Sequence, residues 1–443
     1  MARFLMAVWP IPGHYYPNLA VAHALRARGH DVAFLTGSRA REVIERQGFA
    51  CFTFHHVDER GLDKIFFEAQ PNRPWWKPPI LVQRARTYDW LVGLLPGQVP
   101  DVEDASERWE PDVIVCDPTF WGAFLVMPER RGIPVAIFVY LPFCPAAGPG
   151  IPPLGFGLPA ASGGVARLQL AAARSLFWMA TRGFREAANE LRRQHGLRPI
   201  DVSVSEFGLA MPLYLIAGTP ELDFDRRGLP ASVHYVGPCI WERPRTGPPP
   251  DWLKTRRRDQ PWVHVTEGTI HTQAPLVSRA AVQGLADLPV QVIISTSVPG
   301  DTVSLGLGPI APNIQLEHWV NIHYSSLLPL TDLVVTTGGA GTVLSSLRAG
   351  VPVILVPTEW DKPDVAQRIV ATGAGLCLSP SECRRGRLRA AVERVLGDPS
   401  FRENARRLAA IFETYRGSDE AARLLEDLSA RTQPAEARLS TAG

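Results

Sequence analysis

The chain has 443 residues, of which 46% are apolar and 20% are charged. A chain of this length is too long for one ordinary hydrophobic core, so we expect two domains. Its 46 Lys and Arg nearly balance its 44 Asp and Glu, and the resulting net charge of +2 argues against a protein that binds by neutralising nucleic-acid phosphates.

The first predicted elements are a strand, a helix and a second strand. Residues 3–9 form an apolar run, a loop follows, a helix begins at about Pro17, and residues 31–35 form another apolar run. Pro17 suits a first helical turn, and Gly29 suits the position just beyond the helix end. The order predicts a βαβ crossover and therefore a parallel sheet.

Two further strands are predicted at residues 113–116 and 135–140, each beside Pro or Gly turns. Residues 54–99 and 141–170 contain Pro, Gly and Trp with weak periodicity, so we expect both to be irregular. Long irregular segments in a compact domain tend to be functional loops.

The second half of the chain repeats the alternation of strands and helices. Residues 241–261 combine proline, glycine and charge as linkers do. The alternation predicts two doubly wound α/β domains, over residues 1–240 and 262–414. We expect a helix at 415–429 to pack back on the first domain and residues 430–443 to form a disordered tail. The apolar runs that support the second domain lie within residues 262–269, 290–296, 313–319, 332–350 and 352–357.

Targeting and membrane signals are absent from the sequence. No stretch of about 18 uninterrupted apolar residues occurs, so we expect no spanning helix and no stable membrane insertion. Residues 1–9 lack the pattern of a secretory signal. The six cysteines form no C-x-x-C pair, which is typical of unpaired thiols in a reducing compartment. These features predict a cytoplasmic protein.

Two polar residues follow predicted strand ends, where open α/β sheets bind ligands. His14 follows the first strand, and Asp117 follows the strand at 113–116. A carboxylate that accepts the N–H on one side of an imidazole leaves the other nitrogen free to take a proton. The pair is a candidate general base. The alternative is a loop-packing histidine and a turn or cap aspartate, which is the more frequent case on sequence geometry alone.

A glycine-rich turn lies between a predicted strand and a helix. Gly338, Gly339 and Gly341 leave space for backbone amides to approach a phosphate at the positive end of a helix. The dinucleotide fingerprint would require a glycine at Leu344, and the first βα turn of the chain also lacks that pattern. A nicotinamide dehydrogenase is therefore disfavoured. A tight turn that needs positive φ explains the glycines equally well.

Together these segments resemble the UDP-glycosyltransferase superfamily, over about residues 3–428. The resemblance rests on residues 13–37, on "HVTEGT" at 264–269, and on residues 319–375 with "TTGGAGT" near their centre. Within the superfamily, the chain is most similar to bacterial enzymes that decorate macrolides, enediynes and aromatic polyketides. The resemblance implies the GT-B fold, in which two Rossmann-like domains face each other across a cleft. It also implies that the N-terminal domain holds most of the acceptor and the C-terminal domain holds the nucleotide sugar.

The resemblance assigns roles to individual residues. His14 matches the catalytic base, and Asp117 matches the acid that orients it. The assignment implies that His14 deprotonates an acceptor hydroxyl, which attacks the anomeric carbon as the nucleotide diphosphate leaves, with inversion. Amides and hydroxyls would hold the diphosphate, so no metal and no other cofactor is required. The residues matched to nucleotide-sugar binding are Gly268 and Thr269 in a phosphate-side turn, Trp319 under the nucleobase, Gly338, Gly339, Gly341 and Thr342 at the diphosphate, and Asp361 at the sugar hydroxyls.

Three positions depart from the family pattern within this site. Thr337 stands where most members have a histidine, and it offers a short hydroxyl instead. Ser345 replaces a frequent glutamate that grips both ribose hydroxyls, which is compatible with a dTDP-linked deoxysugar donor as well as with a UDP-sugar. Lys362 replaces a glutamine, and it either pairs with Asp361 or Asp364 or faces the sugar.

Other candidate residues receive no firm role. Residues 223–225 match the D-x-D metal motif of single-domain glycosyltransferases, but they lie in a predicted loop, so we expect no metal site there. Trp75 and Trp76 either line an apolar acceptor cleft or pack a loop onto its domain. His323 and Tyr324 lie where the chain departs from the family's usual proline and histidine, so they inherit no role.

The expected function is transfer of a sugar from a UDP- or dTDP-sugar to an apolar small-molecule acceptor by an inverting, metal-independent enzyme, which is compatible with a homodimer. One alternative is a nucleotide-sugar epimerase or hydrolase on the same scaffold. Another is a non-catalytic partner that keeps the fold and stabilises a true transferase. The His14 and Asp117 pair argues against the second alternative, whereas Thr337, Ser345 and Lys362 leave it open. The acceptor, the linkage atom and the oligomeric state are not determined by the sequence.

Overall fold

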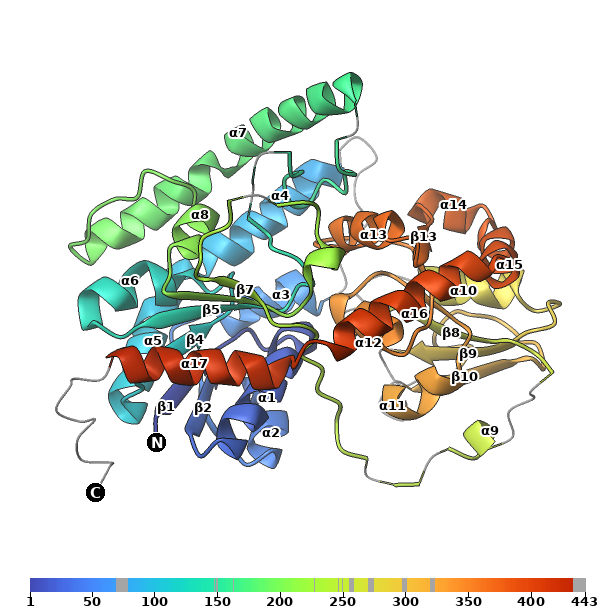
Figure 1. The fold of residues 1–443 in the computed structure, drawn as a ribbon, viewed down its shortest axis with the longest axis horizontal. Coiled ribbons are helices and arrows are strands. Elements are labelled where there is room, and N and C mark those ends of the chain that lie inside the picture. Colours follow the sequence, from blue (N-terminus) through green and yellow to red (C-terminus); the bar gives the residue numbers. More distant parts are fainter. Residues whose placement is uncertain are drawn as a thin grey trace.

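The computed structural model describes most of the chain, and it contains two parallel α/β sheets, one in each half (Figure 1). The described residues are 1–68, 79–146, 148, 150–161, 163–226, 228–245, 247–248, 250–254, 259–269, 275–296, 301–318 and 323–432.

The N-terminal sheet has seven parallel strands in the order β3-β2-β1-β4-β5-β6-β7. Its central strands are continuous apolar runs, because helices cover both faces of a parallel sheet. The strands are β1 (Arg3–Ala7), β2 (Asp31–Thr36), β3 (Ala50–Thr53), β4 (Val113–Cys116), β5 (Val135–Val139), β6 (Leu213–Ile216) and β7 (Val233–Tyr235).

The C-terminal sheet has six parallel strands in the order β10-β9-β8-β11-β12-β13. The apolar runs predicted for this half correspond to β8 to β12. The strands β13 and, in the first sheet, β3, β6 and β7 are not among those that the sequence predicts. The strands are β8 (Trp262–Thr266), β9 (Gln291–Thr296), β10 (Ile314–His318), β11 (Leu333–Thr336), β12 (Val353–Leu355) and β13 (Gly375–Cys377).

Helices cover both sheets. In the first half they are α1 (Pro12–Ala27), α2 (Ser38–Arg46), α3 (Glu59–Phe66), α4 (Pro79–Tyr88), α5 (Leu95–Trp109), α6 (Trp121–Arg131), α7 (Gly164–Gln194) and α8 (Val204–Leu209), with single turns at η1 (Asp89–Gly93) and η2 (Pro220–Leu222). In the second half they are α9 (Asp251–Lys254), α10 (Leu276–Gly284), α11 (Tyr324–Leu327), α12 (Ala340–Arg348), α13 (Lys362–Ala371), α14 (Pro380–Arg384), α15 (Leu388–Gly397), α16 (Pro399–Glu413) and α17 (Ser418–Thr432), with one turn at η4 (Leu328–Leu330).

The expectation of an irregular segment at residues 54–99 is wrong for much of its length. Helices α3 and α4, the turn η1 and the start of α5 lie there. Two of the prolines that suggested a loop stand at helix starts, since Pro79 begins α4 and Pro96 lies in the first turn of α5. At such positions a missing N–H costs no intrahelical hydrogen bond. The other three, Pro71, Pro74 and Pro78, lie outside the described residues.

Helix α1 begins at Pro12 rather than at about Pro17. Pro12 supplies a preset φ at a position that needs no N–H donor. The N–H groups of His14 and Tyr15 donate to the Ile11 carbonyl at 2.8 and 3.0 Å and so close the first turn. His14 therefore lies in the first turn of a helix and not in a loop.

Helix α17 returns to the N-terminal half after α16 has packed in the C-terminal half (Figure 1). It lies beside α1, and Ala421, Ala422 and Leu425 of α17 are buried in the apolar cluster on that face of the first sheet. The two halves are also joined by a second apolar cluster that continues from the first sheet to α12 and β12.

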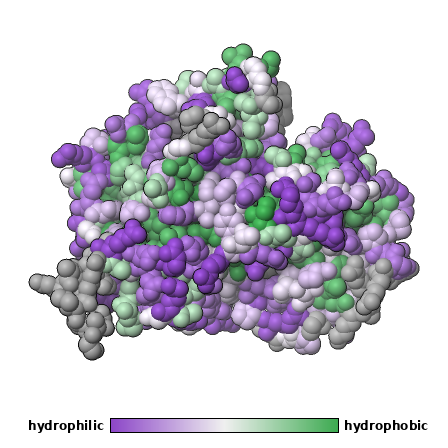
Figure 2. Space-filling model, viewed as in Figure 1, coloured by the Kyte–Doolittle hydropathy of each residue, from purple (hydrophilic) through white to green (hydrophobic). Residues whose placement is uncertain are grey.

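Helix α7 is unusual in its length and exposure. It has 31 residues and carries several exposed large apolar side chains. Figure 2 shows hydrophobic residues at the top of the molecule, where α7 lies in Figure 1. In the described ranges, no helix combines the length and hydrophobicity needed to cross a membrane. The exposed apolar residues of α7 are Val165, Leu168, Leu176, Trp178 and Met179.

Candidate active site

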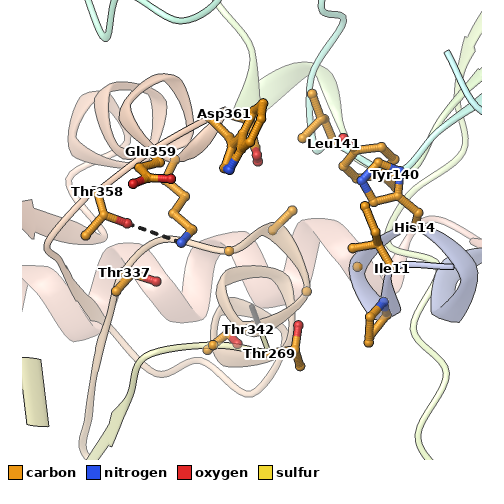
Figure 3. Close-up of a pocket in the computed structure, with 18 of the residues that line it drawn as sticks. Ile11, His14, Tyr140, Leu141, Thr269, Thr337, Thr342, Thr358, Glu359 and Asp361 are labelled. Atoms are coloured by element: carbon orange, nitrogen blue, oxygen red, sulfur yellow. Dashed lines mark hydrogen bonds between the residues drawn. The ribbon is translucent and has the colours of Figure 1, made fainter. Parts of the chain in front are cut away.

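A cleft lies between the two halves and is lined by segments that follow β1, β4, β5, β8, β11 and β12. Its volume is about 2760 Å³. This is well above the roughly 300–1,000 Å³ that accommodates one drug-sized ligand, so the cleft has room for two substrates. Figure 3 shows His14 and Tyr140 on one side of the cleft, with Thr337, Thr342 and Asp361 facing them from the other.

The sheet order brings His14 and Asp117 together. Strands β1 and β4 are neighbours, with Ala7 paired to Cys116, so the segments after them meet at one edge of the sheet. Nδ1 of His14 lies 2.5 Å from Oδ2 of Asp117, and both side chains are buried. A carboxylate can only accept, so this contact assigns the imidazole proton to Nδ1 and leaves Nε2 free to receive another.

Asp117 is itself held in place. Its other carboxylate oxygen accepts the backbone N–H of Thr119 at 2.8 Å and also the hydroxyl of Thr119. That hydroxyl in turn accepts from the indole N–H of Trp9 at 3.0 Å. The carboxylate therefore has one available orientation, which fixes the imidazole ring as well.

Two aromatic residues complete the surroundings of His14, and the sequence analysis assigns a role to neither. The Tyr140 ring lies 3.9 Å from the His14 ring, centroid to centroid, and Trp90 meets it edge to face at 6.0 Å. Burial and the nearby carboxylates of Asp361 and Asp117 raise the pKa of the Tyr140 hydroxyl. Tyr140 directly follows β5, so the same strand-end rule that selects His14 would also have selected Tyr140.

The glycine-rich segment turns from β11 into α12 at the cleft. Gly338 has φ +97°, a conformation that side-chain-bearing residues rarely adopt, and Gly339 caps the start of α12. A Cβ added at Gly339 or Gly341 would meet no protein atom within 4 Å. Because both positions line the cleft, the turn leaves the first amides of α12 open to an incoming group.

A second turn follows β8 beside the glycine-rich segment. Gly268 has φ +85°, and its N–H donates to the Thr266 hydroxyl at 3.2 Å. Thr337 donates its own hydroxyl to the Glu267 carbonyl at 2.9 Å. This bond ties the two turns together, and it uses the only proton that the Thr337 side chain can donate. Thr269 is exposed at the cleft.

The segment after β12 carries Asp361 and Lys362 into the cleft. Burial raises the pKa of the Asp361 carboxyl, against the opposing effect of Lys362 and His14. The Lys362 amine donates to the Thr358 hydroxyl at 3.2 Å, which is the dashed line in Figure 3. The sequence left open whether Lys362 pairs with a neighbouring aspartate or faces the sugar. In the structure Lys362 lines the cleft wall, and the Asp364 carboxylate accepts the Gly155 N–H at 2.7 Å.

Residues around this segment fasten the two halves to each other. Trp360 has φ +61°, and its ring stacks on Phe66 of α3 at 4.9 Å with an interplanar angle of 25°. It also meets Trp90 edge to face at 5.6 Å. Next to it, Glu359 accepts from the Arg86 guanidinium at 2.6 Å. The sequence analysis does not identify these contacts, because each joins residues that lie far apart along the chain.

Asp223, the first residue of the D-x-D segment, has a role in the same interface. Its carboxylate is buried and accepts from Arg226 at 2.6 Å and from Arg368 of α13 at 3.1 Å. The Tyr235 hydroxyl donates to it at 2.7 Å. Two guanidinium groups and a hydroxyl occupy the carboxylate oxygens, so Asp223 is an ion-pair centre between the halves.

The remaining predicted residues lie at the cleft or outside the described ranges. Thr342 and Ser345 of α12 line the cleft, and Thr342 lies 3.2 Å from the Tyr324 hydroxyl. Trp319 and the pair at 75–76 fall outside the residues that the structure describes.

Known proteins match this chain in sequence, two of them over nearly its full length. The family model for the C-terminal domain of erythromycin biosynthesis protein CIII-like proteins matches residues 280–436. The chain is 32% identical to 4'-demethylrebeccamycin synthase of Lentzea aerocolonigenes, over 96% of this chain and 99% of the relative. It is 27% identical to demethyllactenocin mycarosyltransferase of Streptomyces fradiae, over 97% and 87% of the two chains.

Solved structures with the same fold include two glycosyltransferases. The calicheamicin glycosyltransferase CalG4 has a TM-score of 0.68 at 22% identity, covering 98% of this chain and 100% of that one. The spinosyn rhamnosyltransferase SpnG, solved with thymidine diphosphate, has a TM-score of 0.68 at 20% identity, covering 96% and 100%. The two Rossmann-like halves around one cleft are therefore a GT-B fold, as the sequence predicts.

Proposed function

The chain belongs to the bacterial natural-product glycosyltransferases, and we propose that it is an inverting, metal-independent member whose general base is His14. The observation that carries this proposal is the buried contact between His14 and Asp117, which lies across one cleft from the glycine-rich start of α12. A base and an anion-binding turn on opposite walls are what a direct displacement at an anomeric carbon requires.

In the proposed step, Nε2 of His14 takes the proton of an acceptor hydroxyl. The hydroxyl oxygen forms a bond to the anomeric carbon as the bond from that carbon to the donor phosphate oxygen breaks. The bonding electrons leave with the nucleotide diphosphate, and the single displacement inverts the anomeric configuration. Asp117 stabilises the imidazolium that forms, through the Nδ1–H contact.

The leaving diphosphate meets the start of α12. The amides of Gly339, Gly341 and Thr342 lie in the first turn, where the helix carries partial positive charge. Such preorganised donors stabilise charge that develops in the transition state. In this proposal they take the place of a metal ion, and Asp361 contacts the hydroxyls of the donor sugar.

We further propose a dTDP-sugar donor. Ser345 lies one helical turn after Gly341 at the cleft. Its short hydroxyl offers one hydrogen bond, which suits the deoxyribose of dTDP because deoxyribose has one hydroxyl fewer than the ribose of UDP. SpnG and a second structural neighbour, SsfS6, were solved with thymidine diphosphate, which supports the choice of this nucleotide as a probe.

The proposed acceptor is an apolar natural product held mainly by the first half. Many aromatic side chains line that wall of the cleft, which suits a hydrophobic ligand oriented by few polar groups. They include Phe66, Trp90, Trp121, Phe177 and Phe184.

The first experiment combines binding with product analysis. Purified protein without added metal is titrated with thymidine diphosphate and uridine diphosphate, and then supplied with donor sugars and a panel of hydroxylated aglycones. Inverted glycoside, identified by NMR of the anomeric carbon, is the expected product. His14→Ala and Asp117→Asn should lower kcat by about 10²–10⁴-fold while nucleotide affinity is unchanged.

Each alternative gives a different result. Turnover near the wild-type rate in both variants would exclude His14 as the base. Donor consumption without acceptor, to free or epimerised sugar, would indicate a hydrolase or an epimerase. No binding of either nucleotide would favour a non-catalytic partner protein.

A further inference from the structure

Building on the proposed function, we propose that Lys362 supplies the positive charge that binds the donor's diphosphate. Lys362 begins α13 and packs against the glycine-rich turn. A Cβ placed on Gly338 would lie 3.5 Å from the Lys362 carbonyl oxygen and 3.6 Å from the Lys362 Cβ. The backbone and Cβ of Lys362 therefore lie directly beside the turn that presents the α12 amides to the cleft, and its amine is held by the Thr358 hydroxyl at 3.2 Å.

The turn itself offers no formal charge to an anion. Thr337 cannot donate its hydroxyl to a phosphate, because that proton is already shared with the Glu267 carbonyl. The α12 amides contribute only partial charges. Breaking the bond to the anomeric carbon adds one negative charge to the diphosphate, so a full positive charge within reach would bind the product and the transition state better than the amides alone.

Lys362 differs from three of the arginines that also line the cleft. Arg86 donates to a carboxylate and to a backbone carbonyl at 2.6 Å each, and Arg279 is exposed to solvent and donates to a backbone carbonyl at 3.2 Å. Arg348 lies in the last turn of α12, about 12 Å along the helix from its start. Among the residues that the structure describes, the Lys362 amine makes one hydrogen bond, to the Thr358 hydroxyl, and an ammonium has three donors. In this proposal the other donors bind phosphate oxygens.

The charges around Lys362 make its protonation responsive to an anion. Burial lowers the pKa of the amine, and Arg86 acts in the same direction. The carboxylates of Asp361, Glu359 and Glu267 act in the opposite direction. A diphosphate at the turn adds negative charge and raises the pKa of the Lys362 amine again. At any pH where this amine is partly neutral in the free protein, the complex therefore binds more protons than the free protein does.

The decisive experiment compares ligands that differ in phosphate. Thymidine, thymidine monophosphate and thymidine diphosphate are titrated into wild type and K362Q by calorimetry. K362Q should bind the diphosphate about 10- to 100-fold more weakly and thymidine equally well. The matched control is R389Q, which removes one positive charge from the outer side of the C-terminal half and should change neither affinity.

A second readout measures the proton directly. Diphosphate binding to wild type should take up more protons than binding to K362Q at any pH where the free amine is partly neutral, seen as a different dependence of the binding enthalpy on the ionisation enthalpy of the buffer. The terminal phosphate of the ligand titrates in both proteins, so the difference between them isolates the contribution of Lys362. Proton uptake is measured per mole of bound ligand, so the comparison holds even if K362Q is less stable.

Three results would overturn the inference. Equal diphosphate affinity in K362Q and wild type would reject it while leaving the proposed function intact. Weaker binding of the donor sugar nucleotide, with unchanged affinity for thymidine diphosphate, would place Lys362 at the sugar. Failure of the wild type to bind any of the nucleotides would reject the proposed function itself.

Discussion

At the scale of single residues, the contacts around His14, the proposed base, hold its side chain in a fixed orientation. Asp117 fixes one ring nitrogen at 2.5 Å, Thr119 fixes the carboxylate, and Tyr140 covers one face of the ring. A side chain held by its neighbours does not pay the entropy of being oriented during the reaction. The α1 helix start adds a rigid backbone beneath it, because His14 lies in the first turn.

Asp364 gives a residue-scale prediction about pH. Its carboxyl has a pKa raised from 3.8 to about 6, mainly by burial. The folded state then holds this proton over a pH range in which the unfolded state has lost it, so stability falls as pH rises from about 4 to about 6. The loss amounts to about 3 kcal/mol from this group, or about 3 °C in melting temperature for a chain of this length.

The measurement is the melting temperature of Asp364→Asn relative to wild type across pH 4 to 7. The amide oxygen of Asn can still accept the Gly155 N–H but does not titrate. The variant should match wild type near pH 4 and exceed it near pH 7. A difference that does not change with pH would contradict the assignment.

At the scale of elements, the strand, turn and helix around Gly338 present backbone N–H groups to the cleft, where we propose that the diphosphate binds. The positive φ of Gly338 redirects the chain so that α12 begins at the cleft. Lys362 and Leu355 pack closely against Gly338, and a Cβ placed on Gly338 would lie 3.3 Å from the Leu355 side chain. Gly339 and Gly341, by contrast, adjoin open space, so their missing side chains benefit a ligand rather than the fold.

This contrast predicts the behaviour of Gly341→Trp. No protein atom within 4 Å opposes a Cβ there, so folding should be unaffected, whereas the indole would occupy the diphosphate position. We expect thymidine diphosphate binding by calorimetry to be lost at an unchanged melting temperature. Gly397→Trp, at an exposed position at the end of α15 with equally open space, serves as the control and should bind normally. Normal binding by Gly341→Trp would place the diphosphate elsewhere.

At the scale of the whole molecule, the segment between β12 and α13 connects the two halves at the candidate active site. Trp360 inserts among aromatic rings of the first half, and its backbone accepts a φ of +61° to do so. Such strain costs on the order of 1–3 kcal/mol and persists only where packing outweighs it. Because Asp361 follows directly, the docking of Trp360 sets the position of the proposed sugar contact relative to His14.

Trp360→Ala should therefore impair chemistry more than nucleotide binding. We expect kcat to fall by about 10- to 100-fold, since a displacement of about 1 Å at a reacting centre can have that effect. Affinity for thymidine diphosphate should fall by a smaller factor than kcat, because α12 is untouched and only Lys362 among the proposed diphosphate contacts lies in the displaced segment. Trp360→Phe should recover most of the rate by restoring a ring against Phe66. The measurements are steady-state kinetics and calorimetry. A loss of nucleotide affinity at constant kcat would show that Trp360 acts on the nucleotide instead.

Local patterns in the sequence were enough to predict the class of fold and several positions at the cleft. Apolar runs separated by glycine and proline identify the long strands, and residues next to strand ends identify His14, Asp117 and the glycine-rich turn, because neighbouring parallel strands end at one edge. The family resemblance and the GT-B fold are confirmed by the relatives and the solved structures. The roles proposed for individual residues remain predictions.

Only the tertiary structure decided which distant segments meet. The start of α1 at Pro12 depends on hydrogen bonds to Ile11, which a proline pattern alone does not reveal. Tyr140, Trp90 and Trp360 reach the site because the sheet order and the docking of the two halves bring β5, η1 and the loop after β12 together. Such contacts depend on side-chain packing between elements far apart in the chain, whereas sequence periodicity reports only which face of one element is buried.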